Sequence, residues 1–176
     1  MIKYAITDPS FFNPYNPFKY FESLDANFVL FRDKTNSNYR KDAQVFMQNA
    51  QKFPFKKIVH QEYLLAKDIK ADGVHLSSKQ FGDISKAKDL GLFTIISTHS
   101  FDEIKQAQML GADAVTFSPI FKTPNKGKPK GVEILKQAVD SFEIKVIALG
   151  GIITQKHIKE LEYANPWGFA SIRYFQ

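Results

Sequence analysis

Short runs of apolar, β-branched and aromatic residues recur along the chain at intervals of roughly 20 residues, and a stretch with helical spacing of its apolar residues follows each run. Parallel strands joined by crossover helices produce this alternation. The pattern predicts eight strands, at 3–7, 27–31, 57–60, 73–76, 93–97, 114–118, 145–149 and 167–171. It predicts seven helices, at 17–24, 40–52, 62–70, 82–90, 101–110, 132–141 and 154–163.

Local signals support the boundaries of several of these helices. Ser100 precedes the helix at 101–110 and Glu103 follows three residues later, which is the pattern of a capping box. Gly91 and Gly111 stand where two helices should end, because glycine readily takes the left-handed conformation found after a helix C-terminus.

Eight strands in alternation with helices fit a closed barrel, whereas a flavodoxin-like sheet has only about five or six strands. We therefore predict an α/β fold, a single (β/α)8 TIM-type barrel formed by one domain over residues 1–176. Because the chain stops soon after the last predicted strand, we expect the last helix to be short or missing. An uncovered wall would expose an apolar patch, so we expect a neighbouring element or a second subunit to cover it, and we expect a homo-oligomer.

The composition narrows the function rather than the fold. The formal net charge is +6, but Lys and Arg are scattered among Asp and Glu, which is typical of a solvated basic surface suited to small anions. The chain has no cysteine, which excludes disulfides and thiolate metal sites and fits a cytoplasmic protein. No apolar run reaches the roughly 18 residues of a membrane span. Neither nucleic acid nor membrane is therefore an expected partner.

The segment after the sixth predicted strand, 118–131, is a long polar loop with several lysines. Active sites of (β/α)8 barrels lie at the carboxyl ends of the strands, and long loops in compact domains are usually functional. Thr123 and Asn125 can donate hydrogen bonds to an anion there, and Lys126 can supply a positive charge. The alternative is a mobile surface loop that its lysines keep solvated.

Two further strand ends carry residues suited to phosphorylated ligands. Gly150 and Gly151 follow the seventh predicted strand, where paired glycines let backbone N–H groups approach a phosphate closely. Arg32 and Lys34 follow the second strand and alternate along an extended chain, so that both point to one side. Such a pair suits a pyrophosphate or a carboxylate. The alternative is a pair of ordinary surface charges.

Six motifs follow one another along the chain: Tyr4-Ala-Ile-Thr-Asp8, Ala71-Asp-Gly-Val-His-Leu76, Ser97-Thr-His-Ser100, Gly111-Ala-Asp-Ala-Val115, Pro119-Ile-Phe-Lys-Thr-Pro-Asn-Lys126 and Ala148-Leu-Gly-Gly-Ile152. In this order and spacing, over nearly the whole chain, they resemble the thiamine phosphate synthase and TenI superfamily. The resemblance implies a part in thiamine biosynthesis. Synthases of this superfamily join a pyrimidine diphosphate to a thiazole phosphate and require magnesium.

The resemblance also implies roles for individual residues. The phosphate-binding positions that it carries over are Thr123, Asn125, Lys126, Gly150, Gly151, Ile172 and Arg173. Asn125 stands where the family has a threonine, and it can still donate a hydrogen bond. Ser97 matches a serine that faces the pyrophosphate in the synthases. Arg32 and Lys34 match two cations that follow the second strand of the family's barrel.

The chain departs from the synthases where they hold magnesium. His60 and Gln61 stand in place of an Asn-Asp pair, and Gln80 replaces an aspartate of the family pattern. Both magnesium carboxylates are therefore lost, and neutral amides do not compensate a hard cation for its dehydration. We expect no metal site and no cofactor, with magnesium needed only if synthase activity is retained.

The TenI branch includes thiazole tautomerases, which shift a proton on a thiazole carboxylate phosphate without a metal. Their histidine after the sixth strand is absent, because Pro119 occupies that position. His60 is the candidate base, since it follows the third strand and imidazole titrates near neutral pH. The alternative for His60 is a structural, hydrogen-bonded role. We expect His75 in the core and His157 on the surface.

The sequence therefore predicts a TenI-like protein that binds a thiazole phosphate or thiamine phosphate independently of metal. One alternative is a true thiamine phosphate synthase, which also takes a pyrimidine diphosphate. Another is a non-catalytic regulatory protein that binds thiazole phosphate. Whether the chain is an enzyme, and then a transferase or an isomerase, stays open. The candidate catalytic residues are His60, Arg32, Lys34 and Ser97.

Overall fold

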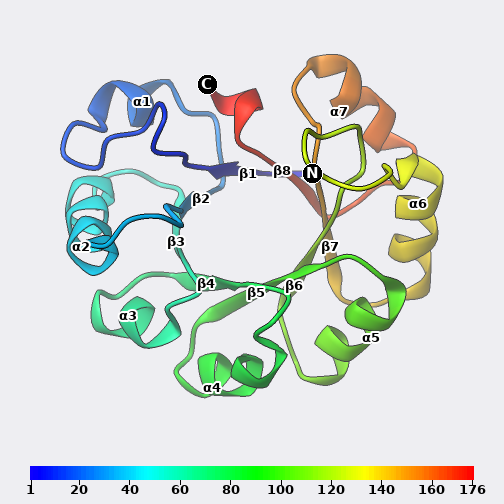
Figure 1. The fold of residues 1–176 in the computed structure, drawn as a ribbon, viewed down its shortest axis with the longest axis horizontal. Helices are drawn as coiled ribbons and strands as arrows, with labels where there is room; N and C mark the ends of the chain where they lie inside the picture. The colour runs from blue at the N-terminus through cyan, green and yellow to red at the C-terminus, as the bar shows by residue number, and fades with distance from the viewer.

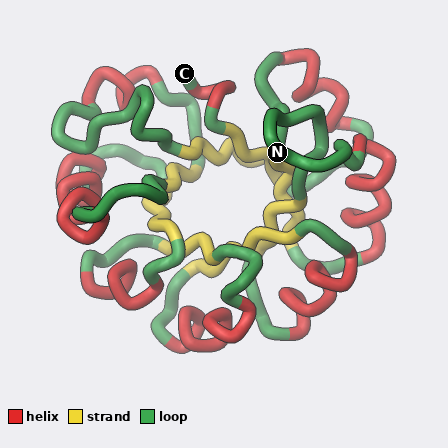
Figure 2. Tube along the Cα trace, in the orientation of Figure 1, coloured by secondary structure: helices red, strands yellow, loops and turns green.

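The computed structural model describes all residues from Met1 to Gln176 and forms a closed barrel of parallel strands. The strands are β1 (Ile2–Ile6), β2 (Phe28–Phe31), β3 (Lys56–His60), β4 (Gly73–Leu76), β5 (Phe93–Thr98), β6 (Ala114–Phe117), β7 (Lys145–Leu149) and β8 (Gly168–Ser171). Each strand pairs with the next, and β8 pairs with β1 to close the ring. Figures 1 and 2 show this ring inside an outer ring of helices. The predicted (β/α)8 barrel is confirmed.

The helices cover the outside of the strands. They are α1 (Phe18–Ser23), α2 (Tyr39–Ala50), α3 (Tyr63–Asp68), α4 (Ile84–Asp89), α5 (Phe101–Met109), α6 (Gly131–Ser141) and α7 (Gln155–Glu162), with the 3-10 helices η1 (Phe81–Asp83) and η2 (Arg173–Phe175). None of them combines the length and the apolar character that crossing a bilayer requires. Every predicted helix is present, with ends that shift by a few residues.

The residues predicted to mark helix ends make the expected hydrogen bond or adopt the expected backbone angle. The Ser100 hydroxyl accepts the Glu103 N–H at 3.2 Å, and the Glu103 carboxylate in turn accepts the N–H of His99. Gly91 and Gly111 adopt φ angles of 77° and 83°, in the left-handed region. The Ser100 cap at the start of α5 and the glycine stops after α4 and α5 are therefore confirmed, whereas Glu103 bonds the N–H of His99 in place of that of Ser100, which a standard capping box would use.

The segment predicted as one helix over 82–90 begins instead with the 3-10 helix η1. The Asp83 N–H bonds the carbonyl of Gln80, three residues back, at 3.0 Å. The Gln80 side-chain oxygen also accepts from the N–H and the hydroxyl of Ser77, at 3.0 and 2.9 Å. Hydrogen bonding by the Gln80 side chain thus stabilises a tighter turn before α4 begins.

The strands separate two apolar layers. Apolar side chains that fill the barrel come from one face of every strand except β4: Tyr4, Ile6, Leu30, Ile58, Ile95, Ala114, Ile147 and Ala170. Side chains on the other face pack under the helices in a larger cluster of 34 buried residues. Because successive residues of a strand point to opposite faces, one continuous apolar run supplies both layers.

Aromatic rings close the amino-terminal end of the barrel. The Trp167 ring lies 5.7 Å from the Phe28 ring and 6.1 Å from the Phe93 ring, between centroids. The Lys145 ammonium lies over the Phe93 and Trp167 rings, at 5.7 and 5.3 Å from their centroids. Packing of this kind at the amino-terminal end stabilises a barrel, which leaves the carboxyl end for ligands.

A short element covers the flank of β8, where the last helix was expected to be short or missing. In Figure 1 the red η2 turn lies between α1 and α7. Its Tyr174 and Phe175 rings lie 5.2 and 5.9 Å from the Phe169 ring, which points outward from β8. The expected cover by a neighbouring element is thus present. The expected homo-oligomer stays a prediction.

Candidate anion-binding site

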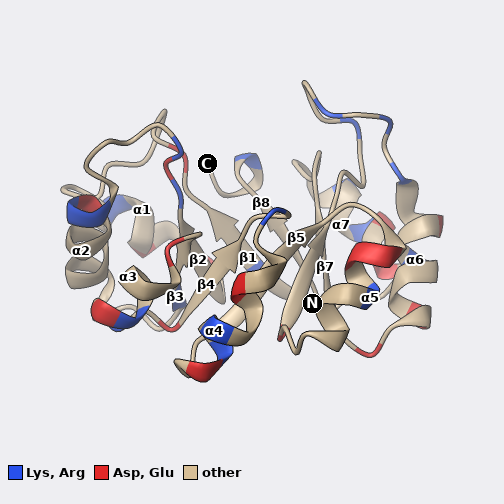
Figure 3. Cartoon of the chain, turned by 60° about the horizontal axis from the view of Figure 1, so that its bottom comes forward, with Lys and Arg blue, Asp and Glu red and all other residues tan.

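All the predicted site residues lie at the carboxyl end of the barrel. One set, the β6–β8 group, follows β6, β7 and β8 and consists of Thr123, Asn125, Lys126, Gly150, Gly151, Ile172 and Arg173. The other, the β2–β3 group, consists of Arg32, Lys34 and His60. Ser97 lies near the end of β5. Figure 3 shows the basic residues along the loop before α6, which extends beyond the strand ends.

The paired glycines lie directly against the loop after β6. The Ile120 N–H bonds the Leu149 carbonyl at 2.9 Å, and the Phe121 N–H bonds the Gly150 carbonyl at 3.0 Å. A Cβ on Gly150 would lie 2.8 Å from the Cα of Pro119. A Cβ on Gly151 would lie 2.7 Å from Phe121 Cβ, and its φ is 72°. Glycine is therefore required here for close chain packing and a left-handed backbone, in addition to any contact with a ligand.

Backbone donors at the ends of β7 and β8 have no partner within the protein. The N–H groups of Gly150, Gly151 and Ile152 make no hydrogen bond to another residue, and neither does that of Ile172. The Ser171 hydroxyl donates to the Ile152 carbonyl at 2.6 Å, which joins the two strand ends. Since backbone N–H groups in folded proteins are normally paired, this cluster is suited to an anionic ligand.

The tip of the loop after β6 forms a turn that presents Lys126. The Lys126 N–H bonds the Thr123 carbonyl at 3.3 Å, and Asn125 between them has a φ of 58°. Asparagine tolerates this left-handed conformation better than threonine does. The Thr123 hydroxyl donates to the Phe121 carbonyl at 3.0 Å, so its oxygen can still accept but its proton is engaged.

The cations of the β2–β3 group and the β6–β8 group act on one another across the open carboxyl end of the barrel, which we call the mouth. Burial lowers the pKa of Lys34, and the positive charges of Arg32 and Lys126 lower it further. Burial also lowers the pKa of Arg32, and the carboxylates of Asp8 and Asp33 oppose that shift. The charge of Lys126 in the β6–β8 group therefore acts on Lys34 in the β2–β3 group, and a negative ligand between them would relieve the repulsion.

His60 lies beside these cations as a neutral imidazole. Burial, then the charges of Arg32 and Lys34, lower its pKa to about 3. Its ring centroid lies 6.4 Å from that of His75. A base with such a low pKa accepts a proton poorly near neutral pH, so the role assigned to His60 needs a ligand group that stabilises its protonated form against both burial and the neighbouring charges.

A polar network lies inside the barrel beneath the mouth. His75 is buried, as expected, and its two ring nitrogens lie 3.0 Å from the Tyr4 hydroxyl and 3.0 Å from the Ser97 hydroxyl. Burial lowers the pKa of His75 to about 3. The network holds the predicted site residue Ser97 from below, and the sequence pattern did not indicate this. The contact that places His157 against the Phe121 ring, 4.5 Å between centroids, was missed as well.

The residues at the positions where the resemblance implies magnesium ligands do not fit that ion. The Gln80 amide nitrogen donates to the Gln61 carbonyl and to the Asp83 carboxylate, both at 3.3 Å. The Gln80 oxygen is engaged with Ser77, and Asp83 forms an ion pair with Lys86 at 3.0 Å. No three His, Cys, Asp or Glu side chains gather as a metal centre would require. Neutral, already bonded oxygens cannot replace carboxylates around Mg²⁺.

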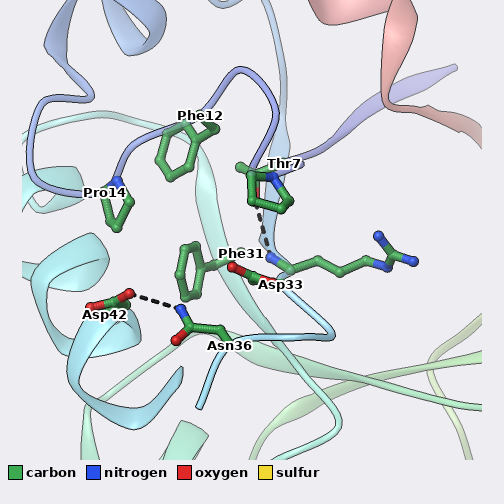
Figure 4. Close-up of a pocket in the computed structure, with 9 residues that line it drawn as sticks. Thr7, Phe12, Pro14, Phe31, Asp33, Asn36 and Asp42 are labelled. Atoms are coloured by element: carbon green, nitrogen blue, oxygen red, sulfur yellow. Dashed lines mark hydrogen bonds between the residues drawn. The ribbon is translucent and has the colours of Figure 1, made fainter. Parts of the chain in front are cut away.

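A small cavity lies behind Arg32, between the loops that follow β1 and β2. Its volume is about 30 Å³, and its walls include Phe12, Phe31 and Asn36. Figure 4 shows these side chains, with the bond from the Arg32 N–H to the Thr7 hydroxyl at the edge of the cavity. A space of this size holds a water molecule but no ring. The cavity is therefore not a site for a ligand that contains a ring.

Comparisons with known proteins agree with the resemblance found in the motifs. The model of the family described as thiamine monophosphate synthase matches residues 4–175. A thiamine-phosphate synthase of Lactococcus lactis subsp. lactis is 30% identical over 153 residues, which cover 81% of this chain and 70% of that protein. One of Nitrosococcus oceani is 27% identical over 144 residues, with coverages of 78% and 66%. The chain therefore spans only part of the length of these relatives.

Solved structures share the fold. The thiamine phosphate pyrophosphorylase of Pyrococcus furiosus superposes with a TM-score of 0.84 over 97% of this chain and 85% of that one. The identity between the two is 24%, so this likeness concerns the fold alone. The barrel with its helices therefore agrees with a solved structure over nearly the whole chain.

Proposed function

We propose, since this chain belongs to the thiamine monophosphate synthase family, that it is a TenI-like member which binds a thiazole phosphate or thiamine phosphate without magnesium. The phosphate lies against the β6–β8 group at the carboxyl end of the barrel. The heterocycle extends from there towards the β2–β3 group.

The cluster of unpaired backbone donors carries this proposal. Gly150, Gly151, Ile152 and Ile172 offer N–H groups at adjacent strand ends, beside the turn that presents Lys126. Several N–H donors and one cation are what a phosphate monoester needs, because each oxygen then keeps a hydrogen bond on leaving water. The ends of β7 and β8 are also the usual phosphate position in barrels of this type.

The bond between the Gln80 amide and the Gln61 carbonyl supports independence from magnesium. It joins the two positions from which carboxylates would have to reach the ion. The cations Arg32, Lys34 and Lys126 supply positive charge in the same mouth. A ligand anion can therefore be neutralised by side chains without a bridging metal.

Turnover depends on whether a ligand activates His60. A proton shift on a thiazole ring needs a base whose pKa lies near the working pH. A carboxylate on the ligand, placed beside Arg32 and Lys34, raises the pKa of His60 from about 3 because it offsets their charge. Binding without turnover is the second candidate function, and the low pKa of His60 in the ligand-free protein favours it.

A calorimetric titration with thiazole phosphate tests the proposal. We expect micromolar binding that is the same with excess EDTA and with added magnesium. Absence of heat at millimolar ligand, or binding that appears only with magnesium, would contradict it. Thiamine phosphate titrated in parallel identifies the preferred ligand.

A genetic test separates a binder from an enzyme. Complementation of a strain that lacks thiamine phosphate synthase would show synthase activity and overturn the proposed metal-independent role. Proton exchange on the ring of a thiazole carboxylate phosphate, followed by NMR in D₂O with EDTA, reports tautomerase turnover. We expect exchange to depend on His60 if the protein is an isomerase, and no exchange if it only binds.

A further inference from the structure

Tyr39, the first residue of α2, connects the ends of two strands that carry the β2–β3 group. Its hydroxyl donates to the Phe31 carbonyl at 2.8 Å and accepts the His60 N–H at 2.8 Å. Its ring stacks on the Phe31 ring, with centroids 5.2 Å apart and an angle of 19° between the planes. The Tyr39 side chain thus contacts both His60 and Phe31, the residue that precedes Arg32.

The hydroxyl lies where the pairing of β2 with β3 ends. The last pair in the ladder is Phe31 with Val59, and no pair follows it. On the other side of β2, the Arg32 N–H donates to the Thr7 hydroxyl at 3.0 Å. The peptide group between Phe31 and Arg32 is therefore held by a hydroxyl on each side, at the point where the chain leaves the sheet.

Only a neutral phenol can make both bonds of Tyr39. Burial raises the pKa of Tyr39, so the hydroxyl keeps its proton at all ordinary pH values. A protonated hydroxyl can donate to a carbonyl while its lone pair accepts an N–H. A phenylalanine at this position would keep the stacked ring and lose both bonds.

We propose that Tyr39 is a positioning residue, which holds Arg32 and His60 in one arrangement so that Arg32 binds an anionic group other than the phosphate held by the β6–β8 group, such as the carboxylate of a thiazole carboxylate phosphate. This inference rests on the proposed function, in which the β2–β3 group faces the ligand. The Tyr39 hydroxyl itself touches no ligand. It acts through the backbone of the two strands.

The fixed backbone matters because the Arg32 side chain is long and has many rotamers. A guanidinium binds an anion tightly only if little side-chain and backbone freedom is lost on binding. Without the hydroxyl, the Phe31 carbonyl and the His60 N–H lose their common partner and the two strand ends can separate. Water then reaches the His60 ring, and burial no longer holds its pKa as low.

Substitution of Tyr39→Phe tests the inference with inorganic pyrophosphate as the probe anion, in EDTA. We expect about five- to tenfold weaker binding of pyrophosphate, corresponding to about one lost hydrogen bond. Thiazole phosphate, held by the β6–β8 group, should bind within about twofold of the unaltered protein. The pKa of His60, read from ring-nitrogen NMR shifts, should rise from about 3.

Two further variants keep the inference testable. Tyr163→Phe removes a hydroxyl that bonds Glu133 on the outside of the barrel, so it should change none of these quantities. In an Arg32→Gln background, Tyr39→Phe should have no further effect on pyrophosphate binding, because Tyr39 acts through Arg32. Far-ultraviolet circular dichroism checks that each variant folds.

The outcomes separate this inference from the proposed function. Equal pyrophosphate affinity in Tyr39→Phe and the unaltered protein overturns the role of Tyr39, and so does an additive effect in the Arg32→Gln background. Failure of the unaltered protein to bind pyrophosphate overturns it as well, while thiazole phosphate binding can still stand. A parallel loss of both ligands in Tyr39→Phe would show a general structural role instead.

Discussion

The two sides of the barrel mouth are built from different parts of the chain. On the β6–β8 side, backbone N–H groups at the strand ends have no partner within the protein, and Gly150 and Gly151 let the chain pack closely there. On the β2–β3 side, side chains provide the chemistry: two cations, a neutral imidazole and the hydroxyls that support them. A backbone site tolerates changes of side chain, whereas a side-chain site changes its chemistry with every substitution.

The departures from the family pattern follow this difference. The one in the β6–β8 group, Asn125, lies in a left-handed turn that asparagine accepts readily. Gln61 and Gln80, which follow β3 and β4, stand where the resemblance implies the two magnesium carboxylates, and His60 precedes Gln61. Phosphate binding can therefore persist in a chain whose second site has been altered.

The largest expected effect comes from a substitution in the β6–β8 group, where backbone N–H groups form the site. Gly151→Ala forces an L-residue into a φ of 72° and places a Cβ 2.7 Å from both Phe121 and the Lys122 carbonyl. We expect the free energy of unfolding to fall by about 2–4 kcal/mol and thiazole phosphate binding to be lost. Urea unfolding and calorimetry measure these. Gly127→Ala is the matched control, since nothing lies within 4 Å of its Cβ position, and it should alter neither.

The second prediction tests whether the buried imidazole of His75, beneath the β2–β3 group, is neutral in the folded protein. His75 has a pKa of about 3 when folded against an ordinary 6.5. The unfolded chain takes up this proton as pH falls below 6.5 and the folded chain does not, so stability is lost between pH 6.5 and pH 3. We expect about 2 kcal/mol lower stability at pH 5 than at pH 7 from His75. Urea unfolding at both pH values measures the loss, and His75→Gln should show less of it. An unchanged loss in that variant would contradict the assignment.

The third prediction concerns a variant in which two carboxylates are placed near the β2–β3 group. Gln61→Asp with Gln80→Asp adds two negative charges near Arg32 and Lys34, which should weaken pyrophosphate binding in EDTA about tenfold. Magnesium should then restore it, whereas the unaltered protein should not respond to magnesium. Gln44→Asp with Gln48→Asp, both on α2, adds the same charge away from the mouth and serves as the control. A magnesium response in the unaltered protein would show that the carboxylates are not needed.

The smallest expected effect concerns Lys126, whose charge acts on Lys34 in the β2–β3 group. Lys126→Ala should weaken both pyrophosphate and thiazole phosphate about two- to fivefold, because an exposed charge contributes modestly. The pKa of Lys34 should rise in this variant, since the charge of Lys126 helps to lower it. NMR of the lysine side chains measures that shift. Lys128→Ala, two residues along the same loop, is the control and should leave the pKa of Lys34 where it is. Equal effects of the two substitutions would remove the special role of Lys126.

Much of the fold follows from local features of the chain. The predicted strands at 73–76 and 145–149 coincide with β4 and β7, and the others differ by one residue at one or both ends. Ser100, Gly91 and Gly111 act as their types predict, because capping and left-handed turns depend on a few adjacent residues. The helix expected at 82–90 was only partly right, because the Gln80 side chain bonds Ser77 and Asp83 and imposes a 3-10 turn.

The sequence predicted which strand ends carry the site residues, but it did not predict how these residues contact one another. The sequence placed Arg32, Lys34, His60 and Lys126 at one end of a barrel, yet whether they bind as proposed stays a prediction. No pattern indicated the bonds of Tyr39 to Phe31 and His60, because a tyrosine at the start of a helix is unremarkable by itself. Its partner His60 is 21 residues away in the chain.

The chain itself determined the alternation of strands and helices, the end of the barrel that carries the polar residues, and the loss of two carboxylates. Only the tertiary structure decided that Gln80 bonds Gln61, that four N–H groups are left without partners, and that Lys126 reaches the charge of Lys34. Periodicity acts over a few neighbouring residues and can be recognised in a linear sequence. Contacts between strand ends arise only when eight strands close, since closure brings together segments that are more than a hundred residues apart.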